Sequence, residues 1–341
     1  METAVAVGVA LLVSLAAPAL LKPLLSHLGV IDVPNARSSH TVSAIRGLGL
    51  APLVAMLFGL LVVLIDPVRQ ADSPLIMSVA LISVAVGLLG WVEDSHGIPV
   101  VIRAGLQLAL GAAGAGVLTV ITGMPLWLAP LLAVAVAGYI NVANFMDGIN
   151  GISGLHGAAS GAAYAIIGAI AGELWMVPVG LVVAVAFLGF LPWNLIRGGM
   201  FLGDVGSYLL GGSLAMVAAA AIARGVPILG AVGPLAIYLA DAGVTLVRRV
   251  LRGERWFEAH RSHVYQRLTD AGLSHLQVAA IVTAFGIASS ASGLLAVATP
   301  ALWPLSVLLL LIVVVVYFML GRIVNALRGR HIDEVSGGRK A

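Results

Sequence analysis

The stretch at residues 307–316, which reads Val-Leu-Leu-Leu-Leu-Ile-Val-Val-Val-Val, decides the fold class of this chain. It lacks the alternation of polar and apolar residues that a strand of a membrane β-barrel requires. In a bilayer, a helix satisfies the backbone of such a run within the segment itself. Of the 341 residues, 60% are hydrophobic and 10% are charged, and the mean hydropathy is +1.09. The sequence therefore predicts an all-α, polytopic integral membrane protein and excludes a soluble domain.

The numbers of glycine and cysteine residues indicate how the helices of this membrane protein pack and which covalent and metal sites it lacks. The chain has 41 glycines, and small residues let transmembrane helices approach closely where no hydrophobic force drives their association. It has no cysteine, which excludes disulfides and thiolate metal sites. The first apolar run follows Met1 and Glu2 without a basic segment, so we expect a first span rather than a cleaved signal peptide.

Eleven apolar runs along the chain are long enough to cross a bilayer. A hydrocarbon core of about 30 Å needs about 20 apolar residues per helix. The predicted spans are residues 4–22, 48–65, 75–92, 104–122, 125–142, 152–171, 174–192, 204–223, 226–246, 276–298 and 301–321. Short and longer polar connections alternate between them, so all the short ones fall on one side of the membrane.

The basic residues orient these spans. Arg69 and Arg224 lie on the side of the short connections, whereas every other Lys and Arg lies on the opposite side or at span ends that face it. The positive-inside rule makes that opposite side cytoplasmic. With an odd number of spans, we expect the N-terminus outside and the C-terminus cytoplasmic. Residues 1–341 then form a single transmembrane domain with a basic cytoplasmic loop at 248–275.

Acidic residues next to the spans gather on the predicted cytoplasmic side. Asp94, Asp147 and Asp204 each adjoin a span, and glycines lie beside Asp147 and Asp204. Acids near hydrocarbon are costly, and glycine lets a ligand approach the backbone closely. Taken together, these segments indicate a site for a hard cation such as Mg²⁺, which shares its oxygen ligands with substrate phosphates. For each acid alone, a solvated helix cap is the alternative interpretation.

The segment 144–151, Asn-Phe-Met-Asp-Gly-Ile-Asn-Gly, repeats polar residues at a spacing of three. If this stretch is helical, Asn144, Asp147 and Asn150 lie on one face, as the ligands of one site would. A polar stripe that lines the interior of the bundle is the alternative.

Basic groups that suit phosphates lie on the same side. His260, Arg261 and His263 crowd four positions of the loop, which suits a phosphate clamp or a proton donor; the alternative is a solvated loop that sets orientation. Arg103 begins a span, where it either points into the site or snorkels to the interface. Asp241 lies near the predicted cytoplasmic end of its span, where it supports this loop or accepts a structural hydrogen bond.

Five segments, in order along the chain, carry a resemblance to a known family. They are residues 32–40 (Asp-Val-Pro-Asn-Ala-Arg-Ser-Ser-His), Glu93-Asp94, 144–151, 201–207 (Phe-Leu-Gly-Asp-Val-Gly-Ser) and 260–266 (His-Arg-Ser-His-Val-Tyr-Gln). Together they resemble the polyprenyl-phosphate N-acetylhexosamine-1-phosphate transferase superfamily, glycosyltransferase family 4, over nearly the whole chain. The similarity is strongest to the bacterial branch that starts O-antigen and related surface glycans, and phospho-MurNAc-pentapeptide translocase is a distant relative.

This resemblance implies a reaction, a cofactor and a location. The reaction is transfer of an N-acetylhexosamine 1-phosphate from a UDP-sugar to undecaprenyl phosphate with release of UMP. It depends on Mg²⁺, for which Mn²⁺ can substitute. The location is the bacterial inner membrane, with the site on the cytoplasmic face among membrane lipids. No nucleic-acid partner is expected, and the wider superfamily suggests a homodimer.

The resemblance also implies residue roles. Asp94, Asp147 and Asp204 look catalytic: Asp204 as principal metal ligand, with Asn150 as a second ligand, and Asp94 as the group that deprotonates or orients the lipid phosphate. The other candidates are Asn144, Arg46, Arg103, His260, Arg261 and His263 as substrate-binding residues, and Glu93 and Asp241 as supporting residues. Glu93 and Asn150 each stand where the family pattern has Asp. Asn150 can still coordinate a metal through its carbonyl oxygen.

Two other classes of function compete with this interpretation. A secondary transporter also has many spans, glycine-rich helices and intramembrane acids, but its ligand groups lie near the midplane. A non-catalytic assembly scaffold would not require the acidic segments and the basic loop to lie on one face.

Overall fold

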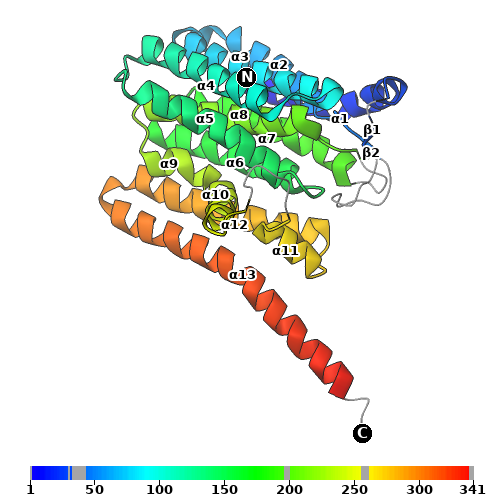
Figure 1. Cartoon of the computed structure of the whole chain (residues 1–341). Helices are drawn as coiled ribbons and strands as arrows, with labels where there is room; N and C mark the ends of the chain where they lie inside the picture. Colours follow the sequence, from blue (N-terminus) through cyan, green and yellow to red (C-terminus); the bar gives the residue numbers. More distant parts are fainter. Residues whose placement is uncertain (1, 30, 33–43, 196–199, 255–260, 338–341) are drawn as a thin grey trace.

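The computed structural model describes residues 2–29, 31–32, 44–195, 200–254 and 261–337, with the side chains of 31, 32, 44 and 321–337 excepted. Its helices lie side by side across the view of Figure 1. The helical elements are α1 (Glu2–His27), α2 (Leu50–Leu64), α3 (Ser73–His96), α4 (Val100–Thr122), α5 (Leu128–Met146), α6 (Ile152–Ala171), α7 (Met176–Leu195), α8 (Gly203–Ala223), α9 (Ile228–Val232), α10 (Ala236–Leu251), α11 (Val264–Asp270), α12 (His275–Ala298) and α13 (Trp303–Gly337). Three 3₁₀ turns accompany them: η1 (Pro67–Asp72), η2 (Gly233–Leu235) and η3 (Pro300–Leu302).

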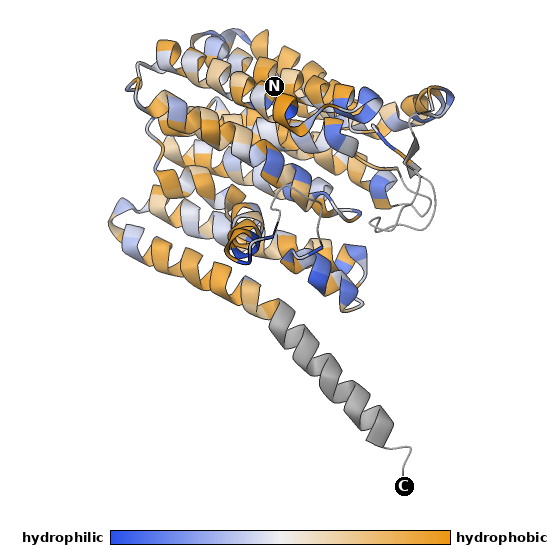
Figure 2. Cartoon of the chain, in the orientation of Figure 1, coloured by the Kyte–Doolittle hydropathy of each residue, from blue (hydrophilic) through white to orange (hydrophobic). Residues whose placement is uncertain are grey.

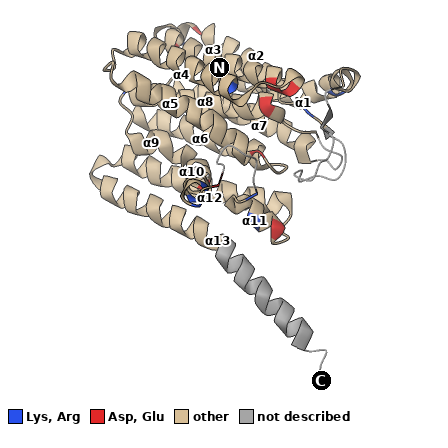
Figure 3. Ribbon diagram, viewed as in Figure 1, with Lys and Arg blue, Asp and Glu red and all other residues tan. Residues whose placement is uncertain are grey.

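The predicted all-α membrane fold is confirmed. Within the described residues, ten helical segments are long and apolar enough to span a bilayer, and α2, with 15 residues, is a shorter apolar helix. Each of the eleven predicted spans corresponds to one of these segments. The chain is therefore a multi-pass membrane protein. In Figure 3 the Lys, Arg, Asp and Glu of the described part gather mainly in the middle and on the right of the view, and Figure 2 shows hydrophilic positions in the same places.

Helix α8 lies at the centre of the bundle, and small residues bring its neighbours close. A Cβ atom at Gly90 of α3 would collide with the backbone of Asp204 at the start of α8. A Cβ atom at Gly211 would come within 2.7 Å of the Cα of Ile140 in α5. These close approaches are the packing that small residues allow between membrane helices. They place the first turn of α8 directly against the last turn of α3.

The predicted ninth span, residues 226–246, is not one regular helix. It is divided into α9, η2 and α10, because Pro234 cannot donate a backbone hydrogen bond. Side chains of neighbouring helices satisfy the carbonyl groups near the break: the Ser160 hydroxyl donates to Pro234 O at 3.0 Å and the Tyr164 hydroxyl to Ala231 O at 2.7 Å. Irregular backbone inside a membrane is stable only with such partners.

A short extended segment before α2 contacts the residues that lead into α8. The strands β1 (Ile31–Asp32) and β2 (Ala44–Ile45) pair antiparallel, and Ile45 also bridges to Met200. The backbone N–H of Gly49 then donates to Leu202 O at 2.8 Å. The segment before α2 is therefore attached to the segment before α8, at the end of the bundle where the charged residues lie.

Candidate active site

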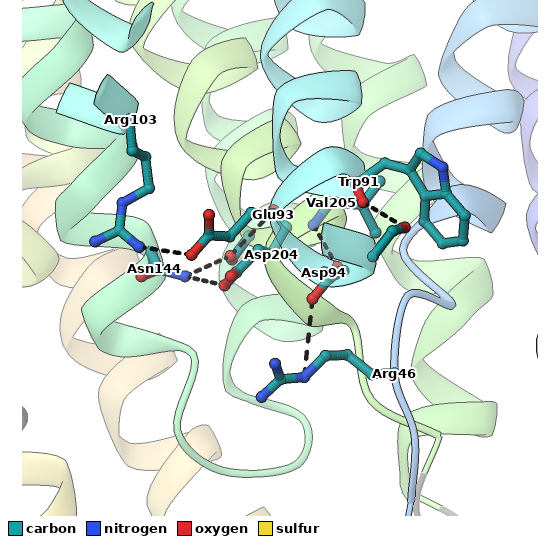
Figure 4. Close-up of polar contacts among 10 residues, drawn as sticks. Arg46, Trp91, Glu93, Asp94, Arg103, Asn144, Asp204 and Val205 are labelled. Carbon is teal, nitrogen blue, oxygen red and sulfur yellow. Dashed lines mark hydrogen bonds and ion pairs between the residues drawn. The ribbon is translucent and has the colours of Figure 1, made fainter. Parts of the chain in front are cut away.

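Asp94 joins the last turn of α3 to the first turn of α8. Its Oδ2 accepts the Val205 backbone N–H at 3.0 Å, so a carboxylate from one helix caps the N-terminus of another (Figure 4). The positive end of the α8 dipole favours a negative charge there. The Asp94 side chain is fully buried, and Arg46 Nε lies 3.8 Å from its Oδ1. Among the described residues Oδ1 has no hydrogen-bond partner, which leaves it available to a ligand.

Gly203 allows this cap to form. Its φ of +72° lies in the left-handed region that glycine occupies without strain. A Cβ atom there would lie 2.5 Å from Asp94 Oδ2 and 2.8 Å from Gly47 N. Both the turn before α8 and the position of the Asp94 carboxylate therefore require glycine at this position.

We expect Gly203→Ala to lower the free energy of unfolding by about 3–4 kcal/mol, because strain at positive φ adds to the collision with Asp94. Gly97→Ala is the matched control, since Gly97 also has a positive φ, +69°, but an added Cβ would meet nothing within 4 Å. It should cost about 1 kcal/mol. Unfolding in detergent measures both variants. Equal losses would contradict the account of Gly203.

Asn144 at the end of α5 contacts Asp204 in the first turn of α8. Its Nδ2 donates to Asp204 Oδ1 at 2.6 Å and to Ser207 Oγ at 3.1 Å. The amide thereby orients the Asp204 carboxylate, and Figure 4 shows Asp204 beside Glu93 and Asp94. The structure thus brings Asp94, Asn144 and Asp204 together from α3, α5 and α8.

Arg103 points toward this cluster. Its Nη1 donates to Glu93 Oε1 at 3.0 Å, which joins the start of α4 to the end of α3 (Figure 4). Glu93 Oε2 and the Tyr208 hydroxyl are buried and, among the described residues, have no hydrogen-bond partner. Such atoms are expected beside a site that a polar ligand or water fills.

The segment 144–151 is not one helix, so the condition for a shared face of its polar residues is not met. Helix α5 ends at Met146, Asp147 has φ −83° and ψ 50°, and Gly151 has φ +89°. Asn144, Asp147 and Asn150 therefore do not share a helical face. The cause is local: Gly148 and Gly151 favour a turn, and α6 begins only at Ile152.

Asp147, in the turn between α5 and α6, nevertheless lies near Asp204. Its Oδ1 accepts the Ser153 hydroxyl at 2.6 Å. Burial raises the pKa of the Asp147 carboxyl to about 7; the Ser153 hydrogen bond lowers this pKa and the negative charge of Asp204 raises it. A carboxyl group with a pKa near neutrality is characteristic of functional sites.

The turn after α5 is held from two sides. The Gly151 N–H donates to Asn194 Oδ1 at 2.6 Å, and Asn194 Nδ2 donates to Met200 O at 3.0 Å. Asn150 donates its backbone N–H to His275 Nδ1 at 3.4 Å, a contact on the α12 side of the turn. The 144–151 turn is therefore attached both to the segment before α8 and to α12.

The basic loop contributes residues with different surroundings. His260 lies outside the described residues. Arg261 is partly exposed and pairs with Asp270, with Nη2 2.9 Å from Oδ1. His263 is buried, and its Nδ1 lies 3.3 Å from Asp241 Oδ1. The predicted 248–275 loop also contains the helix α11, which sequence reasoning missed.

The oxygen atoms around Asp204 fit a magnesium ion in their chemistry. Within the described part of the chain, no three His, Asp or Glu side chains gather as a metal cluster. A Mg²⁺ ion needs only one or two carboxylates, however, because waters and substrate phosphates complete its shell. Asp204 and Asp94 Oδ1, which accepts no hydrogen bond from the described residues, are carboxylate donors of this kind.

Known proteins have sequences similar to the part of the chain that contains this cluster. The profile of the family described as "Glycosyl transferase family 4" matches residues 75–222, which run from α3 to α8 and include the Asp94–Asn144–Asp204 cluster. A "probable undecaprenyl-phosphate N-acetylglucosaminyl 1-phosphate transferase" of Bacillus subtilis is 24% identical over 321 residues, 86% of each chain. Residues 75–222 of the chain thus match glycosyl transferase family 4, in agreement with the predicted superfamily.

Other relatives agree with this similarity. A "decaprenyl-phosphate N-acetylglucosaminephosphotransferase" of Mycobacterium tuberculosis is 26% identical over 315 residues, 78% of this chain and 77% of its own. A "phospho-N-acetylmuramoyl-pentapeptide-transferase" of Lacticaseibacillus paracasei is 41% identical over 81 residues, 24% of this chain and 25% of its own. The chain is thus a transferase, and the predicted resemblance to this superfamily is confirmed.

Sequence reasoning missed several residues of the candidate site. Ser207 accepts from Asn144, Ser153 donates to Asp147, and Asn194 connects the 144–151 turn to Met200. Ser207 ends the quoted 201–207 motif, and Asn194 is a lone amide at the end of an apolar span. Each could have been singled out as a polar residue that needs a partner near hydrocarbon.

Proposed function

We propose that this protein transfers an N-acetylhexosamine 1-phosphate from a UDP-sugar to a polyprenyl phosphate such as undecaprenyl phosphate, with release of UMP. The observation that carries the proposal is the Asp94–Asn144–Asp204 cluster at the N-terminus of α8, with Arg103 beside it. Carboxylate oxygens, a helix N-terminus and a guanidinium suit Mg²⁺ and phosphate groups. The names of the relatives support the same reaction class.

An apolar cavity supports a lipid acceptor. It has a volume of about 550 Å³ and is lined by α4, α5, α8, α9 and α10. Arg103 and Asn141 line its polar end, and Ile222 and Val232 line it farther along the bundle. An isoprenoid chain in this cavity would place its phosphate at Arg103, next to the Glu93–Asp94 pair.

The proposed chemistry is an in-line phosphoryl transfer. An oxygen of the acceptor phosphate attacks the β-phosphorus of the UDP-sugar, the bond from that phosphorus to the bridging oxygen breaks, and UMP leaves. Mg²⁺, when bound, neutralises the diphosphate charge. Asp94 accepts or orients the proton of the acceptor phosphate, Arg103 holds this phosphate, and Asn144 fixes the Asp204 carboxylate.

The position of the site supports an enzyme rather than a transporter. Asp94 lies in the last turn of α3 and Asp204 in the first turn of α8, so both lie at helix ends rather than near a midplane. Because Lys and Arg are concentrated on the same side, we place this end at the cytoplasmic face of a bacterial inner membrane. The product would start a lipid-linked surface glycan of the O-antigen type.

The proposal is tested with purified protein in detergent, undecaprenyl phosphate, Mg²⁺ and a panel of UDP-N-acetylhexosamines. We expect UMP release with at least one donor, dependent on the lipid and abolished by a chelator. Mn²⁺ should restore activity to the chelated protein. Absence of UMP release with every donor, from protein that is folded by its thermal transition, would contradict the proposal.

A further inference from the structure

A buried carboxylate holds the C-terminal end of the basic loop. Asp241 of α10 is fully buried, and its Oδ1 lies 3.0 Å from Val264 N and 3.3 Å from His263 Nδ1. Its Oδ2 also accepts from Val264 N, at 3.1 Å. His263 and the first turn of α11 are therefore fixed against α10 by one side chain.

The shortest hydrogen bond to this carboxylate comes from the last helix. The Tyr317 hydroxyl of α13 donates to Asp241 Oδ2 at 2.7 Å. Tyr317 is fully buried, and its ring makes edge contacts with Phe285 and Phe318, with centroids 5.5 Å and 5.6 Å apart. These aromatic contacts hold the hydroxyl in place, so α13 acts on the loop through Asp241.

The hydrogen bonds of Asp241 show what Tyr317 contributes. Oδ1 is engaged by His263, by Val264 and, at 3.4 Å, by Thr245. Without the Tyr317 hydroxyl, Oδ2 would keep one hydrogen bond from the described residues. That bond comes from the Val264 N–H, which Oδ2 shares with Oδ1. The carboxylate could then rotate, since a buried charge moves toward whichever donors remain.

The orientation of His263 depends on this carboxylate. An Nδ1 that donates to a carboxylate fixes the ring and leaves Nε2 as the nitrogen for any further contact. The ring also stacks on Tyr265, with centroids 5.7 Å apart. A loose Asp241 would therefore change the ring angle of a residue that belongs to the predicted substrate-binding loop.

We propose that Tyr317 is a positioning residue for the donor substrate, acting through Asp241 on His263. The inference rests on the proposed function and on the expected substrate-binding role of Arg261 and His263, which we assign to the diphosphate and sugar of the donor. It assigns to α13 an indirect part in donor binding, although Tyr317 lies in a lipid-facing helix 54 residues after His263 along the chain.

The test compares Tyr317→Phe with Tyr164→Phe. Tyr164 is also fully buried in a span and also donates a 2.7 Å hydrogen bond, to Ala231 O, but it does not contact the loop. Tyr317→Phe should raise the KM for the UDP-sugar about tenfold, equivalent to about 1.4 kcal/mol. The KM for undecaprenyl phosphate should stay unchanged. Tyr164→Phe should leave both constants at the wild-type values.

Two further measurements separate positioning from a loss of stability. In a His263→Gln background, Tyr317→Phe should add less than twofold to the donor KM, because both changes act on one interaction. Amide exchange of residues 261–266 should rise in Tyr317→Phe and not in Tyr164→Phe. This second readout does not depend on turnover.

The outcomes are distinguishable from those for the proposed function. If wild-type protein releases UMP and the two Tyr→Phe variants behave alike in donor KM and amide exchange, the inference about Tyr317 is wrong and the proposed function stands. If wild-type protein releases no UMP with any donor, the proposed function is wrong, and the inference that rests on it is wrong as well. An additive effect of Tyr317→Phe and His263→Gln would also overturn the inference.

Discussion

Asp204→Ala is expected to lower turnover about a thousandfold while the protein stays folded. The carboxylate supplies the charged oxygens at the start of α8, and removing a group that stabilises developing charge costs several kcal/mol. The fold should survive, because Asn144 Nδ2 keeps its hydrogen bond to Ser207 Oγ at 3.1 Å. UMP release under saturating donor and acceptor measures the loss.

Asp66→Asn is the matched control for this prediction. Asp66 is also a buried acid, its Oδ1 accepts from Val68 N at 3.0 Å, and its Oδ2 lies 3.6 Å from Arg69 Nε. It follows the end of α2 that is opposite to the site. We expect its turnover to stay within about twofold of wild type. Near-normal UMP release from Asp204→Ala would contradict the metal role of Asp204.

Asp94→Asn is expected to lower kcat about a hundredfold, the second largest effect. The amide oxygen can still accept the Val205 N–H, so the cap on α8 is retained. What is lost is the negative charge that orients or deprotonates the acceptor phosphate, a contribution of about 10²–10⁴-fold. The measurement is kcat at saturating undecaprenyl phosphate.

Glu93→Gln tests whether the effect belongs to Asp94 or to the acidic pair as a whole. Glu93 pairs with Arg103 at 3.0 Å, and a Gln side chain keeps an oxygen for that donor. We expect a loss of less than about tenfold. If Glu93→Gln were more damaging than Asp94→Asn, the roles of the two residues would have to be exchanged.

The spans could be predicted because hydropathy is a local property of the chain. Each apolar run forms a helix wherever it packs, so the runs alone indicated the fold. The break at Pro234 was not predicted, because the residues that hydrogen-bond to the backbone there, Ser160 and Tyr164, come from another helix. The shared face that a helix over 144–151 would give does not form, because Gly148 and Gly151 favour a turn there.

The composition of the site was only partly predictable. The acidic residues could be selected because a charged side chain beside hydrocarbon is energetically costly and usually has a function. Their partners could not, because they are distant in sequence: Val205 N lies 111 residues from Asp94, and Tyr317 lies 76 residues from Asp241. No spacing along the chain indicates which acid caps a helix and which one supports a loop.

The central claim, transfer of a phosphosugar, is tested most directly with a donor labelled in its β-phosphate. Purified protein, undecaprenyl phosphate, Mg²⁺ and the labelled UDP-N-acetylhexosamine are incubated, and the lipid and aqueous phases are separated. We predict that the label moves into the lipid phase while unlabelled UMP remains in the aqueous phase. Label that stays in the aqueous phase as UDP, with sugar in the lipid, would contradict the account, because the bond broken would then be the one between sugar and phosphate.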